Sequence, residues 1–182
     1  IQDSSFDDIP ETKFVGYSDL KTLGKLIYFK KLENYYNVIF DKTSFYAESG
    51  GQVADTGFMF SKNFKGRVLD VQKVKEVFVH KIEELEGQLI LGDTLKLEVD
   101  IKRRNDIRKN HTATHILQSA LRKVLGSNLQ QLGSYVGPDK LRFDFNFIGA
   151  ISNEDLVEIE NIVNDEILKN TTLGKKKEFI SY

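Results

Sequence analysis

The sequence of 182 residues contains no cysteine. It also has no apolar run close to the roughly 20 residues that a membrane-spanning helix needs. The absence of cysteine excludes disulfide bonds and thiolate metal ligands within this chain, and it agrees with a cytoplasmic location. The first residues lack an initiator methionine, a basic region and the apolar segment of a signal peptide. We therefore expect no membrane partner, and we expect the sequence to lie within a longer protein.

Net charge is also small, at −1 with the histidines neutral, so the chain as a whole does not attract nucleic acid. Hydrophobic residues make up 40% and charged residues 29%, which is typical of a folded globular protein. The basic residues are clustered, however. One cluster spans 175–177 and the other contains Lys102, Arg103, Arg104, Arg108 and Lys109. Charge alone favours solvated helix faces at both places.

Residues 1–101 contain short segments with a strand-like pattern, separated by turn signals. The segments are KLIYF, YYNVIFD, VADTGFMF, GRVLDVQKV, EVFVHKI and DTLKLEVD. Several short strands at this spacing are typical of a small antiparallel barrel. Gly50, Gly51 and Gly57 lie close together, as tight turns or a close backbone approach would require. We predict a β-barrel subdomain over this part of the chain.

The hydrophobic period changes after this point. Residues 102–125 predict one long helix that ends at Gly126. The segments LQQLGSYV and KLRFDFNF then flank the turn GPD and predict an antiparallel hairpin. Alternation of apolar and polar residues along KLRFDFNF indicates that one face of this hairpin is buried.

A second helix is expected to begin after Ser152 or Asn153, either of which can cap its first turn. The tail 171–182 would add one more strand. The predicted fold class is therefore α+β: a small antiparallel β-barrel at 1–101 is followed by part of an α+β domain at 102–182.

Two of the three histidines, His111 and His115, lie four residues apart in the long predicted helix. At that spacing both side chains leave one face about one turn apart and can chelate a single metal ion. They lie nearly opposite the apolar stripe of the helix, which leaves open surface histidines or a site covered by another segment. Thr112 occupies the place of the glutamate in HExxH, which disfavours a metalloprotease. The third histidine, His80, is assigned no function.

Three stretches together strongly resemble the editing region of alanyl-tRNA synthetases, and free-standing alanyl-tRNA editing proteins share them. They are DKTSFYAESGGQVADTG at 41–57, RRNDIRKNHTATHILQSALRKVLG at 103–126 and GSYVGPDKLRFDF at 133–145. The resemblance runs through nearly the whole chain in the family's order and spacing. It implies hydrolysis of tRNA(Ala) that has been wrongly charged with serine or glycine, because a second site adds the discrimination that binding of small amino acids lacks.

The resemblance also implies cofactors. In that family zinc is bound by the HxxxH pair, which His111 and His115 match, and by a cysteine and a histidine of a later CxxxH motif. This chain has no cysteine and ends at Tyr182, so two of the four ligands are expected outside it. ATP and Mg²⁺ would serve a separate aminoacylation domain.

The same resemblance implies roles for further residues. Thr114 and Gln131 match polar positions of the family's editing pocket, although each alone would be interpreted as a surface residue of a helix or hairpin. Arg103, Arg104 and Arg108 would contact phosphates near the acceptor end of tRNA(Ala). The ESGGQ segment would face the pocket or the tRNA end, or would serve only as a structural turn of the barrel.

We therefore interpret the chain as the part of a bacterial-type alanyl-tRNA synthetase that contributes to editing, with tRNA and not DNA as its partner. Two alternatives stay open. One is a tRNA-binding module without catalytic activity, and the other is a truncated free-standing editing hydrolase. By itself, the chain is expected to have little or no activity.

Overall fold

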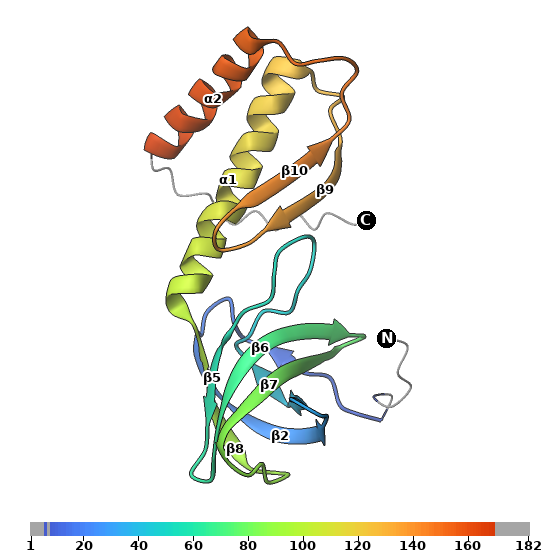
Figure 1. Cartoon of the computed structure of the whole chain (residues 1–182), viewed down its shortest axis with the longest axis vertical. Coiled ribbons are helices and arrows are strands. Elements are labelled where there is room, and N and C mark those ends of the chain that lie inside the picture. The colour runs from blue at the N-terminus through green and yellow to red at the C-terminus, as the bar shows by residue number, and fades with distance from the viewer. Residues whose placement is uncertain (1–5, 7, 170–182) are drawn as a thin grey trace.

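A computed structural model describes residue 6 and residues 8–169 of the chain. The predicted strand at 171–182 and the basic cluster at 175–177 lie outside the described residues. The molecule has two parts, a β-barrel and an elongated layer of two helices and a hairpin that stands on one end of the barrel (Figure 1).

The barrel is closed, and its six strands are joined by antiparallel pairings in the order β2-β3-β7-β6-β5-β8. Side chains alternate between the barrel interior and its surface, as the period of two along the sequence predicts. The predicted barrel is confirmed. In chain order its strands are β2 (Lys21–Lys31), β3 (Tyr36–Phe40), β5 (Gly57–Phe60), β6 (Phe64–Val74), β7 (Val77–Gly87) and β8 (Thr94–Val99).

Two short parallel strands, β1 (Lys13–Phe14) and β4 (Lys42–Thr43), lie beside the barrel. The segment 53–56, predicted as the start of a strand, instead belongs to the long loop between β4 and β5. This loop leaves the barrel and reaches the hairpin (Figure 1).

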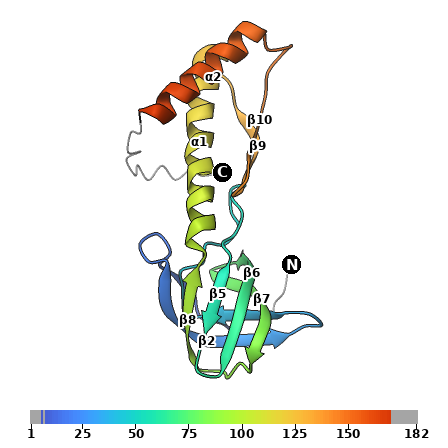
Figure 2. The same cartoon turned by 60° about the vertical axis from the view of Figure 1, so that its left-hand side comes forward.

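The long helix, α1 (Ile101–Leu125), follows β8 with a single residue between them (Figure 2). That residue, Asp100, caps the helix, because its Oδ1 accepts a hydrogen bond from the Arg103 backbone N–H at 2.9 Å. The helix ends at Gly126, whose φ of +117° lies in the region that favours glycine. The predicted helix is thus confirmed to within one residue.

The hairpin consists of β9 (Gln131–Val136) and β10 (Leu141–Phe145), which pair antiparallel. The second helix, α2 (Asn153–Leu168), begins after Ser152, whose hydroxyl oxygen accepts the Asp155 N–H at 3.1 Å. The predicted α+β class is confirmed, while the domain boundary at residue 101 stays a prediction. Neither described helix has the length and apolar character to span a membrane. Side chains of α1, α2 and the hairpin share one core cluster, built around Ala120, Leu121, Leu129 and Ile159.

A second connection between the two parts comes from the ESGGQ segment. The Val136 N–H donates to the Gly51 carbonyl at 2.8 Å, and the Val53 N–H donates to the Val136 carbonyl at 3.0 Å. A Cβ atom on Gly51 would lie 2.4 Å from the Ser134 hydroxyl oxygen, and the φ of +83° also favours glycine. Gly51 therefore permits the close approach that attaches the barrel loop to β9.

Candidate functional site

The histidine pair lies in the middle of α1, with both side chains exposed. The ring centroids of His111 and His115 are 4.7 Å apart, and the ring planes are nearly perpendicular at 88°. Loss of hydration around its ring and, to a lesser extent, the charge of His115 lower the pKa of His111. The neutral form of imidazole, which is the form that binds metals, is therefore favoured at His111.

We tested the donor set of this region against the needs of a zinc ion. A zinc site uses four protein ligands when structural and three when catalytic. Among the described residues, no group of three or more His, Cys, Asp or Glu side chains is placed to hold a metal ion. Two imidazoles one helical turn apart fit two positions of such a site. His111 and His115 would be ligands, and the remaining ligands would come from outside the described part of the chain.

Thr114 lies on a side of α1 that is covered by other residues, and only 8% of its surface is exposed. Its hydroxyl donates to the Asn110 carbonyl at 2.8 Å. Asn110 is one turn earlier on the same face and donates from Nδ2 to the carbonyls of Gly137 and Pro138, at 2.7 and 3.2 Å. Thr114 therefore lies on the face of α1 that meets the hairpin, and its oxygen keeps capacity to accept a further hydrogen bond.

Gln131 is the first residue of β9 and is half-buried. It pairs with Phe145 at a shift in the hairpin register. Gln131 lies at the start of β9, beside Leu129, whose carbonyl accepts from Arg122 Nε near the end of α1 at 3.1 Å. Thr114 is one turn from Asn110, which contacts the turn after the other end of β9. Among the described residues, hydrogen bonds do not connect Thr114 or Gln131 to the histidines.

The three arginines expected at phosphates differ sharply in their surroundings. Arg104 is buried at 7% exposure. Its Nε donates to Asp55 Oδ1 at 2.8 Å, and its Nη2 forms a second contact with the same carboxylate. Its remaining donors reach the carbonyls of Gly16 and Ser44, at 2.7 and 3.1 Å. Arg104 is thus part of the barrel–helix junction, and we remove it from the expected phosphate contacts.

Arg103 is half-buried and donates from Nη1 to the Ala54 carbonyl at 2.7 Å. Arg108, one turn further along α1, is exposed. Sequence reasoning could not separate these roles, because a run of basic residues on a helix points to all sides of it. The junction partner, Asp55, was also missed, because no local signal links it to an arginine 49 positions away.

Much of the 41–57 stretch supports the barrel itself. Asp55 Oδ2 accepts the Tyr46 N–H at 2.7 Å, so the same carboxylate holds both the loop and Arg104. Thr43 Oγ1 lies 2.8 Å from Nε2 of His80 and accepts the Phe45 N–H at 3.1 Å. His80, fully buried, also places Nδ1 3.3 Å from the Val38 carbonyl. The third histidine is therefore a core residue of the barrel.

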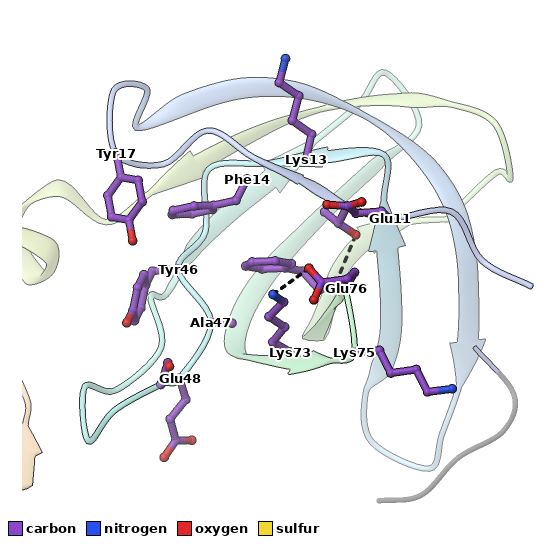
Figure 3. A pocket seen from close by; sticks show the side chains of 13 residues that line it. Glu11, Lys13, Phe14, Tyr17, Tyr46, Ala47, Glu48, Lys73, Lys75 and Glu76 are labelled. Carbon is purple, nitrogen blue, oxygen red and sulfur yellow. Dashed lines mark hydrogen bonds and ion pairs between the residues drawn. The ribbon is translucent and has the colours of Figure 1, made fainter. Parts of the chain in front are cut away.

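Beside this loop the barrel surface has a cavity of about 870 Å³ (Figure 3). Its wall contains Phe14, which stacks on Phe78 at 5.6 Å and meets Tyr17 edge-on at 5.0 Å. Lys73 and Glu76 form an ion pair of 2.9 Å at its rim. Three lysines and three glutamates line it, so its charge favours neither anions nor cations. We assign this cavity no function.

A family model described as tRNA synthetases class II (A) matches residues 5–103. The chain belongs to the class II (A) tRNA synthetases. The match includes the whole barrel and the first three residues of α1, and it ends at Arg103.

Several members of this synthetase family named alanine–tRNA ligase match most of the chain. The identity is 48% over 163 residues with the protein of Fusobacterium nucleatum, 45% over 161 residues with that of Pseudothermotoga lettingae, and 44% over 167 residues with that of Listeria monocytogenes. These matches cover 89%, 88% and 86% of this chain, and so include α1 and the hairpin. The chain spans 19% of the length of each of these relatives.

Proposed function

We propose that this chain is the editing part of an alanine–tRNA ligase and contributes to hydrolysis of tRNA(Ala) that carries serine or glycine. The observation that supports this proposal is the exposed pair His111 and His115 on α1, with buried Thr114 directly before His115 in the same helix. The similarity to alanine–tRNA ligases, at 44–48% identity, supports the choice of tRNA(Ala) in this proposal.

A second hydrolytic site answers a physical need in such an enzyme. A pocket that selects by size rejects a smaller amino acid, or one with an added hydroxyl, by only about 10–200-fold. Hydrolysis of the wrong ester at a separate site multiplies that discrimination. ATP-dependent attachment of alanine, with ATP and Mg²⁺, would take place in another part of the whole ligase.

Each residue of the region would have a defined task in the hydrolysis. The imidazoles of His111 and His115 would supply two of the ligands of a zinc ion. When bound, zinc supplies a Lewis acid that polarises an ester carbonyl or activates water. The Thr114 hydroxyl oxygen and the Gln131 amide would bind the amino acid or orient the attacking water.

The tRNA would approach along the first turns of α1. Arg108 is exposed there, and half-buried Arg103 carries donors beyond the one used by Ala54. Such contacts with phosphates position a tRNA without reading its sequence. We therefore propose that Arg103 and Arg108 hold the backbone near the acceptor end of tRNA(Ala).

The deciding experiment compares two reactions of the full-length ligase. We expect Thr114→Val and Gln131→Ala to slow deacylation of Ser-tRNA(Ala) by roughly tenfold or more, since groups that position water or transfer protons typically contribute about 10²–10⁴-fold. Alanine activation by ATP should stay unchanged in the same preparations, because it takes place elsewhere in the ligase.

Thr112→Val and Gln130→Ala are matched controls, each a neighbour of the same residue type. Both should deacylate Ser-tRNA(Ala) at the wild-type rate. Wild-type deacylation by the Thr114 and Gln131 variants would contradict the proposed editing roles. If the whole ligase bound tRNA(Ala) but did not deacylate it, the alternative of a tRNA-binding module without catalysis would be correct.

A further inference from the structure

The outer surface of the barrel carries two rows of side chains across β6, β5, β8 and β2 that the editing proposal does not use. Directly opposed residues of antiparallel strands point to the same side of the sheet, so the printed register defines each row. The first row is Arg67–Phe58–Glu98–Lys21, and the second is Lys65–Phe60–Lys96–Leu23. We refer to these eight residues as the β5 face; β5, β6 and β8 lie at the front of the barrel in Figure 2.

Two aromatic rings form the centre of the β5 face. Phe58 and Phe60 are two residues apart on β5, and their rings stack with centroids 6.2 Å apart and an interplanar angle of 23°. Phe58 is 38% exposed and Leu23, at the edge of the second row, is 59% exposed. Lys96 lies between Leu23 and the rings, so the apolar surface at the centre of the β5 face is that of the two adjacent rings.

Cations surround these rings. The Arg67 guanidinium lies over the Phe58 ring at 5.9 Å, and the Lys65 ammonium lies over the Phe60 ring at 6.0 Å. On the other side of β5, Lys96 lies on the neighbouring strand β8 and Lys21 lies on β2, one strand further. The eight residues of the β5 face include four cations and a single carboxylate, Glu98, while Glu83 and Glu86 on β7 lie opposite Arg67 and Lys65 at its edge.

The ion pairs of these cations do not block a ligand. Lys96 and Lys21 both contact Glu98, at 2.6 and 3.5 Å, and Arg67 contacts Glu83 on β7 at 3.5 Å. All four cationic side chains remain exposed. Pairs between exposed side chains are worth little, so a phosphate can compete for the same donors.

We propose that the β5 face binds an unpaired stretch of RNA, with bases stacked on Phe58 and Phe60 and phosphates beside the four cations. Stacking rings within a basic surface are the combination by which antiparallel barrels bind single strands with little sequence preference. The choice of RNA rests on the proposed function, since the ligase acts on tRNA. The face is separate from the histidine region, which lies on α1.

An unpaired strand fits this surface better than a duplex. Phe58 and Phe60 lie among cations on one sheet, and every base presents a face that can stack on an aromatic ring once it is unpaired. In an RNA helix the bases are already stacked on one another, so only backbone contacts with the cations would remain. The affinity difference between single strand and duplex therefore tests the role of the rings.

The test is a fluorescence anisotropy titration of the 182-residue chain with a fluorescein-labelled RNA of mixed sequence, 12 nucleotides long, as single strand and as duplex. We expect the single strand to bind more tightly. Phe58→Leu with Phe60→Leu should weaken its binding roughly tenfold or more, while Phe58→Tyr with Phe60→Tyr should retain it, because stacking needs a ring. Lys65→Ala with Lys96→Ala should lower the slope of log affinity against log salt by roughly 1.4.

Controls match each change elsewhere on the surface. Tyr17→Leu removes a ring that is 79% exposed, and Lys13→Ala with Lys30→Ala removes two exposed lysines. Both should bind the single strand like the wild type. Circular dichroism and thermal unfolding of the leucine double variant should match the wild type, which separates lost binding from lost folding.

Several results would overturn the proposal. These are wild-type affinity of the leucine double variant, equal losses in the Tyr17→Leu control, and tighter binding of the duplex. A dimer of the chain that the leucine double variant abolishes would instead assign the β5 face to a second copy. Deacylation by the full-length ligase is a separate readout, so failure of one proposal is distinguishable from failure of the other.

Discussion

The barrel and the helical layer bury their apolar side chains to very different extents. In the barrel, Phe40, Phe45, Met59 and Ile82 are completely inaccessible to solvent. In α2 the only buried residue within the described chain is Ile159. Large apolar side chains of the layer are exposed instead, among them Leu132, Ile148, Leu156, Val157, Ile167 and Leu168.

Closure explains this difference. Six strands that close into a barrel leave no free edge and enclose their own core. The layer has a two-stranded hairpin and two helices, and a two-stranded sheet alone is marginally stable in water. The layer therefore depends on α1, whose first turn is held by the barrel through Arg104 and Asp55. Through this junction, the stability of the layer depends on the stability of the barrel.

Breaking the junction should have the largest effect. Asp55→Ala leaves the Arg104 guanidinium buried without its charge partner, and loss of one partner of a buried pair typically costs about 3–5 kcal/mol. Urea unfolding should show this loss, and hydrogen exchange should rise in the layer as well as in the barrel loop. Asp106→Ala removes an acid from exposed pairs with Lys102 and Lys109 and should cause no comparable loss. Similar unfolding midpoints for both variants would contradict the junction's role.

The second largest effect should be a loss of barrel stability at low pH. Burial lowers the pKa of His80 to about 4, with hydrogen bonds to the Val38 and Phe78 backbone opposing the shift. The unfolded state therefore takes up a proton near pH 6.5, before the folded state does. Stability is retained above about pH 6.5 and declines by about 3 kcal/mol as the pH falls to about 4.

Urea unfolding between pH 7 and 4 would measure this decline. His80→Gln should remove that part of the pH dependence, whereas His111→Gln with His115→Gln should retain most of it. A wild-type profile that parallels that of His80→Gln throughout would show that His80 does not sense acid in the barrel.

Removal of the cap of α2 should have the smallest effect, and that effect should be confined to the helical layer. Ser152→Ala removes the acceptor for the Asp155 N–H and should cost about 1 kcal/mol. Hydrogen exchange should increase in α2 and stay unchanged in β6 and β7. Asp100→Ala removes the corresponding cap of α1 and should affect the layer more widely. Faster exchange in the barrel strands of the Ser152 variant would contradict independent fraying of α2.

Local signals in the sequence predicted much of this fold. Alternating residues marked the strands, Gly126 marked the end of α1, and Ser152 marked the start of α2. Each of these features depends on residues a few positions apart. The spacing of His111 and His115 was likewise a local signal, and the structure places their rings together.

Features that depend on distant residues were not predictable. Arg104 and Asp55 are 49 positions apart, and Thr43 and His80 are 37 apart. Nothing near Arg104 in the sequence distinguishes it from Arg103 and Arg108. The attachment of Gly51 to Val136 also requires knowledge of where the hairpin lies relative to the barrel. The burial of Thr114 follows from that same placement.

Only Asp100 separates β8 from α1, so a small rotation of the helix about this residue would move the middle of the helix by a larger distance. His111 lies ten residues beyond Ile101, about 15 Å along the axis, so a tilt of about 10° at Asp100 would displace its ring by between about 2 and 3 Å. The role that we propose for His111 requires its ring to be held to within about 0.5 Å of its working position. The ESGGQ segment attaches the barrel to β9 at a second point. This attachment restricts rotation of the helical layer about Asp100 and so limits displacement of the histidine rings.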